Sequence, residues 1–510
     1  MSTKVQSIWM ATTPETHFEK LRQDIHVDVA IIGGGITGLT AALLLKQAGK
    51  QVAVVDMNPI ATGETGFTTA HLTEILDMRY HTLISHFGKE GARVAVGSHR
   101  AAISRIEQFI SAGNISCGFT RLPGYLYTEK QADISEIERE VAAARELGVP
   151  ADIREDVPLP FKAVAAMRVE NQARFHPREY LLPLASMIVG NGSSVHEATR
   201  VNHIEDGSPC RVDTDQGRIT AEHVIVASNS PISNWICLHT KVASYRTYAV
   251  GARLAAPVGL EGLFYDTDDP YHYIRTHSLP QGEFIIVGGE DHKTGTVENT
   301  EDCFSRLEAY TRTRFDIAEV PYRWSGQILE SIDGLAYIGR NSFSKNVYVA
   351  TGFSGNGMTY GTIAGMLLSD EILGRKNEWA ALYDATRLKP LASIGEFVSE
   401  NKDFPAYFVG DRLAKADTES VDEVKSGEGK IVSVNGEKLA VYRDDKGAVH
   451  ALSPVCTHMA CLVHWNSAEK TWDCPCHGAR YDPDGKVLNG PAITDLKPAT
   501  LPELHAAEHH

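Results

Sequence analysis

Residues 27–38 read VDVAIIGGGITG, an apolar, β-rich run that passes directly into a cluster of glycines. The residues that follow, Leu39–Ala48, predict a helix that ends at Gly49. A second short strand is expected at Gln51–Asp56. Strand, helix and strand together make a βαβ unit, so the pattern indicates an α/β fold for this part of the chain.

The glycines of this unit have the spacing of a phosphate-binding turn. Gly33, Gly35 and Gly38 form G-x-G-x-x-G between strand and helix, where bare backbone can approach a pyrophosphate and a helix N-terminus can neutralise it. Asp56 ends the second strand, 18 residues after Gly38, where a carboxylate can accept hydrogen bonds from an adenosine ribose. The spacing predicts a dinucleotide site; the alternative is a tight turn without a ligand. It does not distinguish FAD from NAD.

Two later glycine loops suit a flavin. Residues 63–70 read GETGFTTA and follow the second strand closely. This stretch is either an ordinary surface loop or a loop that passes along a flavin's diphosphate and ring. Residues 352–358 read GFSGNGM and open a second helix, whose positive end suits the anionic pyrimidine edge of a reduced flavin. The candidate flavin contacts in these loops are Thr65, Thr68, Thr69, Gly352, Gly355, Gly357 and Met358.

From about residue 27 to 385, the order of these segments resembles the glycine oxidase and D-amino-acid oxidase superfamily of FAD-dependent oxidoreductases. The strand Val224–Ala227 and the pairs Asp333-Gly334 and Ile338-Gly339 belong to the resemblance. It implies a Rossmann-like FAD-binding domain with an inserted β-rich substrate domain. The expected FAD-binding segments are about 27–90, 190–235 and 330–385, and the expected substrate lobe is about 95–190 and 240–325.

The C-terminal part of the chain carries a dense group of metal-binding residue types. Cys456-Thr457-His458 and Cys474-Pro475-Cys476-His477 offer two thiolates and two imidazoles on two loops. Four such ligands could hold zinc. Cys461 and Cys476, however, each stand beside one of the ligand pairs and are spaced to bridge the loops, which a four-ligand zinc site does not require.

This arrangement resembles a Rieske 2Fe-2S domain of the type that has a disulfide. The resemblance implies that Cys456 and Cys474 bind one iron and that His458 and His477 bind the other. It also implies a Cys461–Cys476 disulfide, with Gly490-Pro491-Ala492 as the loop that covers the cluster. We expect an all-β domain at residues 426–502, after a connecting segment at residues 386–425.

One position departs from the respiratory Rieske pattern. Ala479 stands where that pattern has Ser, although Tyr481 keeps a hydroxyl two residues later. Rieske potentials range from about −150 to +300 mV. Because one hydrogen bond to sulfur is missing, we expect a potential in the lower part of this range.

Candidate substrate groups occur in the β-rich segment. Strand alternation places Tyr271, Tyr273 and Arg275 on one face. If that face meets the flavin, Arg275 could pair with a substrate carboxylate and the two rings could hold a cationic amine; the alternative is a solvent-facing sheet. His71 follows the Thr-Thr-Ala stretch and is expected near the flavin, either as a packed side chain or as a base.

Composition restricts the partners. The formal net charge of −16 repels phosphate backbones and anionic lipid headgroups, which argues against nucleic acid or a membrane surface as a partner. No stretch approaches the roughly 20 apolar residues of a spanning helix, and the acidic start of the chain does not resemble a secretory leader. We therefore expect a cytoplasmic protein.

Together, these features predict a two-cofactor oxidoreductase. We expect a small-molecule substrate, an amine or amino acid, to give a hydride to FAD, and the cluster to pass electrons singly to an external acceptor. Two alternatives remain open at this point. A redox partner could feed the cluster, which then reduces flavin for a reductive or oxygen-using reaction, or the protein could be a non-enzymatic electron carrier or redox sensor.

Overall fold

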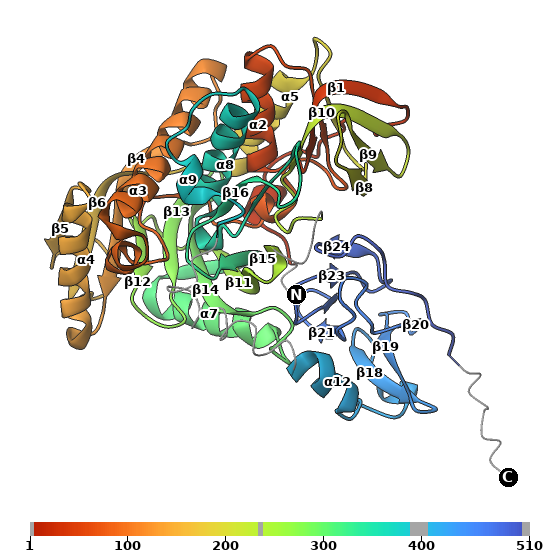
Figure 1. The fold of residues 1–510 in the computed structure, drawn as a ribbon. Coiled ribbons are helices and arrows are strands. Elements are labelled where there is room, and N and C mark those ends of the chain that lie inside the picture. The colour runs from red at the N-terminus through yellow and green to blue at the C-terminus, as the bar shows by residue number, and fades with distance from the viewer. Residues whose placement is uncertain (1–4, 233–237, 388–405, 502–510) are drawn as a thin grey trace. The chain divides into compact units, whose positions relative to one another are not determined.

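The computed structural model describes residues 5–232, 238–387 and 406–501. Residues 388–405 of the predicted connecting segment and the last residue of the predicted Rieske domain lie outside these ranges. The chain forms two compact units (Figure 1). Unit 1 consists of Met1–Val242, Arg246–Asp291 and Phe304–Ser393, and unit 2 of Ala243–Tyr245, His292–Cys303 and Ile394–His510.

Unit 1 contains an eight-stranded sheet with the βαβ unit at its centre. The order is β16-β17-β10-β1-β2-β7, with β9 beside β10 and β8 beside β9. Strands β17, β10, β1, β2 and β7 run parallel, and their carboxyl ends therefore share one edge of the sheet. The strands are β1 (Ile25–Ile32), β2 (Val52–Val55), β7 (Ser194–His196), β8 (Val201–Glu205), β9 (Cys210–Thr214), β10 (Arg218–Val226), β16 (Tyr337–Arg340) and β17 (Val347–Thr351).

Two helices that follow glycine loops pack against each other in unit 1. They are α2 (Ile36–Gln47) and α8 (Gly357–Ile372). A Cβ at Gly361 or Gly365 of α8 would crowd Thr37 or Thr40 of α2, so these small residues permit the close approach. The Ser369 hydroxyl also donates to the Ala41 carbonyl at 3.3 Å.

A second, nine-stranded sheet forms the other layer of unit 1. Its order is β15-β11-β14-β13-β12-β4-β6-β3, with β5 beside β6. The strands are β3 (His71–Leu72), β4 (Thr120–Thr128), β5 (Ala151–Arg154), β6 (Ala165–Arg174), β11 (Val242–Leu254), β12 (Leu263–Asp266), β13 (Tyr273–Leu279), β14 (Gly282–Lys293) and β15 (Ile317–Ser331). Apart from β3 and the last residues of β15, these strands come from the two segments expected to form the substrate lobe.

Helices occupy more of this lobe than the sequence pattern indicated. The longest, α3, spans Tyr80–Gly113 and is broken at Gly88, whose φ is 68°. It was not predicted, and α5 and most of α3 lie in the segment expected to be β-rich. The other helices that lie wholly or mostly in unit 1 are α1 (Ile8–Ala11), α4 (Ile134–Glu146), α5 (Pro177–Ile188), α7 (Glu301–Arg314) and α9 (Ala380–Tyr383). Short 3-10 turns occur at η1 (Glu64–Gly66), η2 (Gln131–Asp133) and η3 (Ser354–Asn356).

Unit 2 contains two small antiparallel sheets. The first joins β18 (Gly429–Val434), β19 (Glu437–Arg443) and β20 (Val449–Leu452), and the predicted Asn435-Gly436 turn connects β18 to β19. Both turn residues have positive φ, 53° and 83°, as a tight hairpin requires. The second joins β21 (His464–Asn466), β22 (Thr471–Asp473), β23 (Arg480–Tyr481) and β24 (Val487–Asn489). Short helical turns precede them at η4 (Ala406–Gly410), α12 (Asp411–Leu413) and η5 (Val421–Glu423).

Among the residues that the structure describes, every helix is too short or too polar to cross a bilayer.

Candidate functional site

The first glycine loop lies between β1 and α2, in backbone geometry that excludes side chains. Gly33 has φ +112°, and a Cβ there would overlap the Ala227 carbonyl at the end of β10. A Cβ at Gly38 would overlap the Gly33 carbonyl, and one at Gly35 would lie 2.9 Å from Thr65 Oγ1. The loop is therefore a bare turn at the N-terminus of α2, which suits a dinucleotide pyrophosphate.

Asp56 fixes this turn from the end of β2. Its Oδ2 accepts a hydrogen bond from Gly34 N at 2.7 Å, and its Oδ1 accepts one from Asn58 N at 2.8 Å. Burial raises the pKa of Asp56 to about 6, and the nearby Glu197 carboxylate adds to the shift. The side chain is half-buried rather than sealed. A carboxylate in this position can accept hydrogen bonds from a ribose hydroxyl.

The loop at residues 63–70 is fastened by hydrogen bonds from three elements. Thr65 Oγ1 accepts from Ile36 N at 3.2 Å, which ties the loop to the start of α2. The indole of Trp9 donates to Thr68 O at 2.6 Å, and that of Trp324 to Phe67 O at 2.8 Å. The loop is therefore held against the first glycine turn rather than lying on the surface.

The second glycine loop, residues 352–358, precedes α8. Gly352 has φ +72°, and Met358 is buried in the first turn of the helix. Gly355 N donates to Asp77 Oδ2 at 2.6 Å, whereas the position of a Cβ on Gly357 meets open space within 4 Å. The loop thus leaves room beside the N-terminus of α8, as a bound flavin edge needs.

An aromatic cluster adjoins both loops. His71 Nδ1 lies 3.0 Å from Tyr265 Oη, and the His71 ring meets the Tyr273 ring edge-on at 5.9 Å. The Tyr271 ring is 5.6 Å from that of Tyr273. Tyr271 Oη lies 3.0 Å from where a Cβ on Gly355 would be, so the cluster touches the loop before α8. The structure therefore brings together three of the four predicted catalytic residues.

His71 is neutral in this cluster. Burial holds its pKa well below the usual range, and the Arg275 guanidinium lowers it further. Within the described chain, His71 Nε2 is buried and has no hydrogen-bond partner. A neutral imidazole with one uncommitted nitrogen can exchange a hydrogen bond or a proton with a ligand.

Arg275, the fourth predicted residue, is engaged with the backbone. Its Nη1 donates to Thr69 O at 3.2 Å, Ala70 O at 2.7 Å and Phe175 O at 3.1 Å. The guanidinium also lies over the Trp9 ring, 5.4 Å from its centroid. These bonds position the loop that leads to His71. The pairing of Arg275 with a substrate carboxylate stays a prediction.

Sequence reasoning missed three residues that complete the cluster: Thr247, Tyr265 and Asp291. Thr247 Oγ1 lies 2.6 Å from Tyr273 Oη, and Thr247 also adjoins the Asp291 carboxylate. All three lie in strands of the nine-stranded sheet. No short motif marks them, because sheet pairing brings them together over long sequence distances.

In unit 2, the predicted metal ligands converge from two loops. Cys456 and Cys474 are buried and hydrogen-bonded to each other, and the rings of His458 and His477 are perpendicular with centroids 4.9 Å apart. The hydrogen bond with Cys474 lowers the pKa of Cys456 to about 7. Burial lowers the pKa of each histidine to about 4, so both rings are neutral, as metal ligation requires. Two sulfurs and two imidazole nitrogens fit a Rieske cluster.

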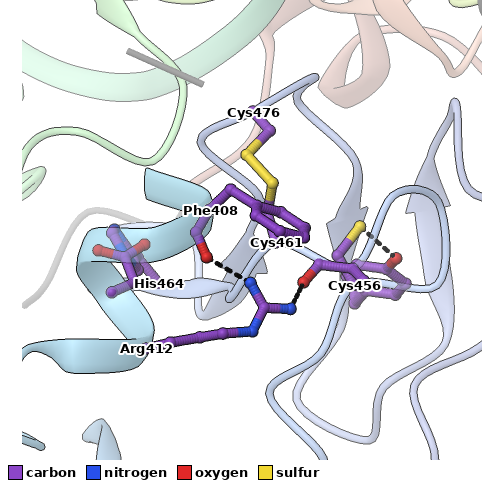
Figure 2. The surroundings of a disulfide bond; sticks show 9 residues. Phe408, Arg412, Cys456, Cys461, His464 and Cys476 are labelled. Carbon is purple, nitrogen blue, oxygen red and sulfur yellow. Dashed lines mark hydrogen bonds and ion pairs between the residues drawn. A yellow bond between two sulfur atoms is a disulfide. The ribbon is translucent and has the colours of Figure 1, made fainter. Parts of the chain in front are cut away.

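A disulfide joins the two ligand loops (Figure 2). Cys461 and Cys476 are bonded, with Cα atoms 6.5 Å apart. Tyr481 Oη lies 3.2 Å from Cys456 Sγ, so the predicted hydroxyl does reach a ligand sulfur. The side chain of Arg412 donates to the carbonyls of Phe408 and Ala460 beside this loop.

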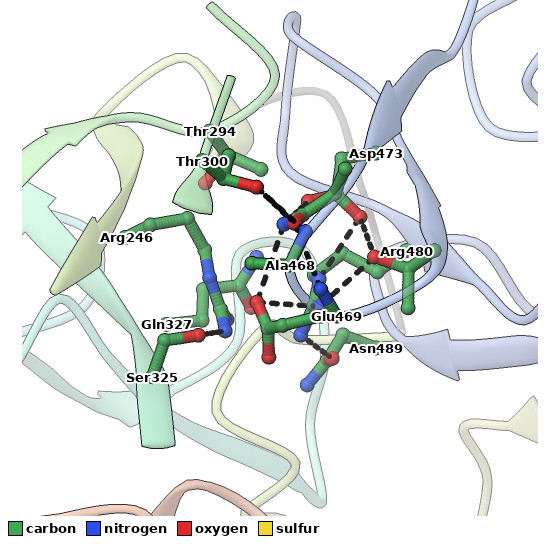
Figure 3. Close-up of polar contacts among 12 residues, drawn as sticks. Arg246, Thr294, Thr300, Ser325, Gln327, Ala468, Glu469, Asp473, Arg480 and Asn489 are labelled. Atoms are coloured by element: carbon green, nitrogen blue, oxygen red, sulfur yellow. Dashed lines mark hydrogen bonds and ion pairs between the residues drawn. The ribbon is translucent and has the colours of Figure 1, made fainter. Parts of the chain in front are cut away.

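A buried polar network supports the second ligand loop (Figure 3). Arg480 Nε is 3.0 Å from Asp473 Oδ1, one residue before Cys474. On the same unit, Thr300 Oγ1 donates to Asn466 Oδ1 at 2.7 Å, and Ala468 N donates to Thr300 Oγ1 at 3.0 Å. Residues 292–303, far from the ligands in sequence, are thus part of the unit that holds them.

The two folds and their sites define an oxidoreductase that carries a flavin and an iron–sulfur cluster. Comparison with known families agrees. The chain belongs to the FAD dependent oxidoreductase (DAO) family, whose model matches residues 28–371, and the Rieske [2Fe-2S] domain model matches residues 415–500. The predicted fold class, the FAD and the 2Fe-2S cluster are confirmed, and the zinc alternative is wrong.

Individual relatives share one or both parts. A putative Rieske 2Fe-2S iron-sulfur protein YhfW of Bacillus subtilis is 33% identical over 97% of this chain and 98% of its own length. The gamma-glutamylputrescine oxidoreductase of Escherichia coli is 25% identical over 74% of this chain and 89% of its own. The glycine oxidase of Geobacillus kaustophilus superposes with a TM-score of 0.61 at 19% identity, covering 71% of this chain and 99% of that structure.

Proposed function

We propose that this enzyme oxidises a C–N bond of an amine or amino acid. FAD supplies the two-electron acceptor and the Rieske cluster supplies a one-electron route to an external acceptor. The names of the similar gamma-glutamylputrescine oxidoreductase and glycine oxidase support this substrate class. The observation that carries the proposal is the aromatic cluster of His71, Tyr271 and Tyr273 beside the loop before α8.

The residues take separate roles in this proposal. The flavin is held by the turn of Gly33, Gly35, Gly38 and Asp56, by Thr65, Thr68 and Thr69, and by Gly352, Gly355, Gly357 and Met358. Tyr271 and Tyr273 orient the substrate, and neutral His71 exchanges a hydrogen bond with it. Arg275 holds the loop before His71 and is the candidate partner for a substrate carboxylate. Cys456, His458, Cys474 and His477 hold the cluster.

Anaerobic rapid mixing with a panel of primary amines and amino acids tests this function. We expect the flavin absorbance to bleach first and the signal of the reduced cluster to rise afterwards in electron paramagnetic resonance. If no member of the panel bleaches the flavin, while a reduced redox partner reduces the cluster and then the flavin, electrons flow in the opposite direction and the proposal is wrong.

A further inference from the structure

Asp291, near the end of β14, has an uncommitted oxygen within the aromatic cluster. The Asp291 carboxylate adjoins Thr247, whose hydroxyl lies 2.6 Å from that of Tyr273. The Oδ1 atom of Asp291 is buried, and the described residues offer it no hydrogen-bond partner. A buried carboxylate oxygen without a donor is costly, so the position favours a ligand that brings one.

The charge of Asp291 is also uncompensated. In the described part of the chain it forms no ion pair with a lysine or arginine. Burial raises its pKa to about 7, and the nearby carboxylates of Asp77 and Glu290 contribute. His272 is a basic neighbour, but its Nδ1 is 2.9 Å from Asp266 Oδ2. A ligand with positive charge would supply the missing counter-ion.

Two tyrosine side chains lie near this carboxylate. Burial raises the pKa of both Tyr271 and Tyr273, and the nearby Asp291 carboxylate contributes to each shift; the two rings are 5.6 Å apart and inclined at 42°. A Cβ on Gly288 would overlap the Tyr273 ring, so that glycine lets the ring lie against β14. The faces of tyrosine rings attract ammonium groups, and the attraction grows when water is excluded.

We propose that Asp291, Tyr271 and Tyr273 bind the cationic amino group of the substrate, with Asp291 as its counter-ion. The inference rests on the proposed amine oxidation and narrows its substrate class. Arg275 already donates to three backbone carbonyls, so its pairing with a substrate carboxylate is secondary, and recognition depends chiefly on the positive charge of the amine. The substrates are therefore amines that need no α-carboxylate.

Three probes of one shape and different charge test the site in the holoenzyme. They are tert-butylammonium, tert-butanol and pivalate. The first has no hydrogen on the carbon bonded to nitrogen, so it cannot be oxidised by hydride loss and its binding can be measured apart from turnover. Ligand-observed NMR with the wild-type enzyme should show tert-butylammonium binding at least about tenfold more tightly than tert-butanol. Equal binding of these two probes, or tighter binding of pivalate, would overturn the proposal.

Asp291→Asn keeps the shape of the side chain and removes its charge. We expect this variant to bind tert-butylammonium about as weakly as tert-butanol, a loss of roughly tenfold or more, with the flavin spectrum retained. Tyr273→Leu, which removes a ring, should weaken binding by a smaller factor. Asp268→Asn removes an equal charge from the same lobe, where Asp268 pairs with Lys130, and should leave binding unchanged.

The outcomes separate this site from the function on which it rests. Asp291-dependent binding of tert-butylammonium without any flavin bleaching by amines would support the site and refute amine oxidation. Flavin bleaching by amines at concentrations that Asp291→Asn does not alter would support amine oxidation and refute the site.

Discussion

The two cofactor sites of this protein are built in opposite ways. The candidate flavin contacts extend from Gly33 to Met358 and are largely backbone positions, brought together by a parallel sheet and two packed helices. The cluster ligands are four side chains between Cys456 and His477, held by two loops and a disulfide. A site made of side-chain ligands should lose its cofactor when one ligand is removed. A site made mainly of backbone should lose its cofactor when a side chain is added.

The largest effect is expected from removing one cluster ligand. His458→Ala should abolish the Rieske signal in electron paramagnetic resonance while FAD stays bound, because the iron loses one of its two imidazoles. His450→Ala is the control, since His450 is a partly exposed histidine of the same unit that pairs with Asp484 at 2.8 Å. Loss of FAD together with the cluster would contradict the independence of the two sites.

The reciprocal experiment adds one methyl group to the flavin turn. In Gly38→Ala the new Cβ would overlap the Gly33 carbonyl, so the turn must open and FAD binding should be lost while iron and sulfide remain. Gly97→Ala lies on an exposed part of α3 where a Cβ meets nothing within 4 Å. That control should raise stability by about 0.5–1 kcal/mol. Retention of stoichiometric FAD by Gly38→Ala, measured by absorbance, would show that the turn does not approach the cofactor.

The same contrast explains how far the sequence could be interpreted. Cys456, His458, Cys474 and His477 were predicted because metal ligands must be particular side chains at short, fixed spacing. The flavin glycines were predicted because G-x-G-x-x-G is a local turn. Thr247 and Asp291 were not, since strand pairing in the nine-stranded sheet brings them together. The helix α3 was also missed: Gly88 interrupts its pattern, yet packing of its buried face keeps the chain helical on both sides.

A third prediction concerns the buried ion pair between Asp333 and Arg387 in unit 1. Asp333 accepts from Arg387 through both oxygens, at 2.7 and 2.8 Å, and the side chains are only 3% and 7% exposed. Asp333→Asn leaves the arginine charge uncompensated and should lower the free energy of unfolding of this region by about 3–5 kcal/mol. The exposed Asp213–Arg218 pair offers a control, because Asp213→Asn should cost under about 1 kcal/mol.

Urea unfolding followed by flavin fluorescence measures both changes, while the cluster absorbance reports on unit 2. Equal losses in the two variants would mean that the buried pair does not stabilise the fold. A parallel loss of the cluster would show that the effect is not confined to the flavin region.

A fourth prediction concerns the loss of stability of unit 1 at acid pH, to which His176 should contribute. His176 Nδ1 accepts from Glu179 N at 3.3 Å and caps α5, which requires the neutral ring, and burial lowers its pKa to about 3, with Arg275 contributing. Because the folded pKa lies below the unfolded value of about 6.5, stability is complete above pH 6.5 and is lost as the pH falls toward 3. Between pH 7.5 and 5 the loss should be about 2 kcal/mol.

His176→Asn keeps a capping oxygen but does not titrate, so it should lose about 2 kcal/mol less than the wild type over the same interval. Urea unfolding at pH 7.5 and 5, again followed by flavin fluorescence, provides the comparison. Identical pH dependence in the two proteins would rule out His176 as a source of acid sensitivity.

The smallest effect should come from tuning the cluster without removing a ligand. Tyr481 Oη is 3.2 Å from Cys456 Sγ and 3.1 Å from Thr457 Oγ1. A hydrogen bond to sulfur stabilises the more negative, reduced cluster, so Tyr481→Phe should keep the cluster and lower its potential by tens of millivolts. Ala479→Ser should raise the potential, since it restores a hydroxyl to the ligand loop. The control is Tyr442→Phe, at a ring stacked on Trp465, which should leave the potential unchanged. Protein-film voltammetry of the wild type and the three variants tests the order of their potentials. A wild-type potential near +300 mV, the top of the Rieske range, would show that the missing serine hydroxyl is compensated elsewhere.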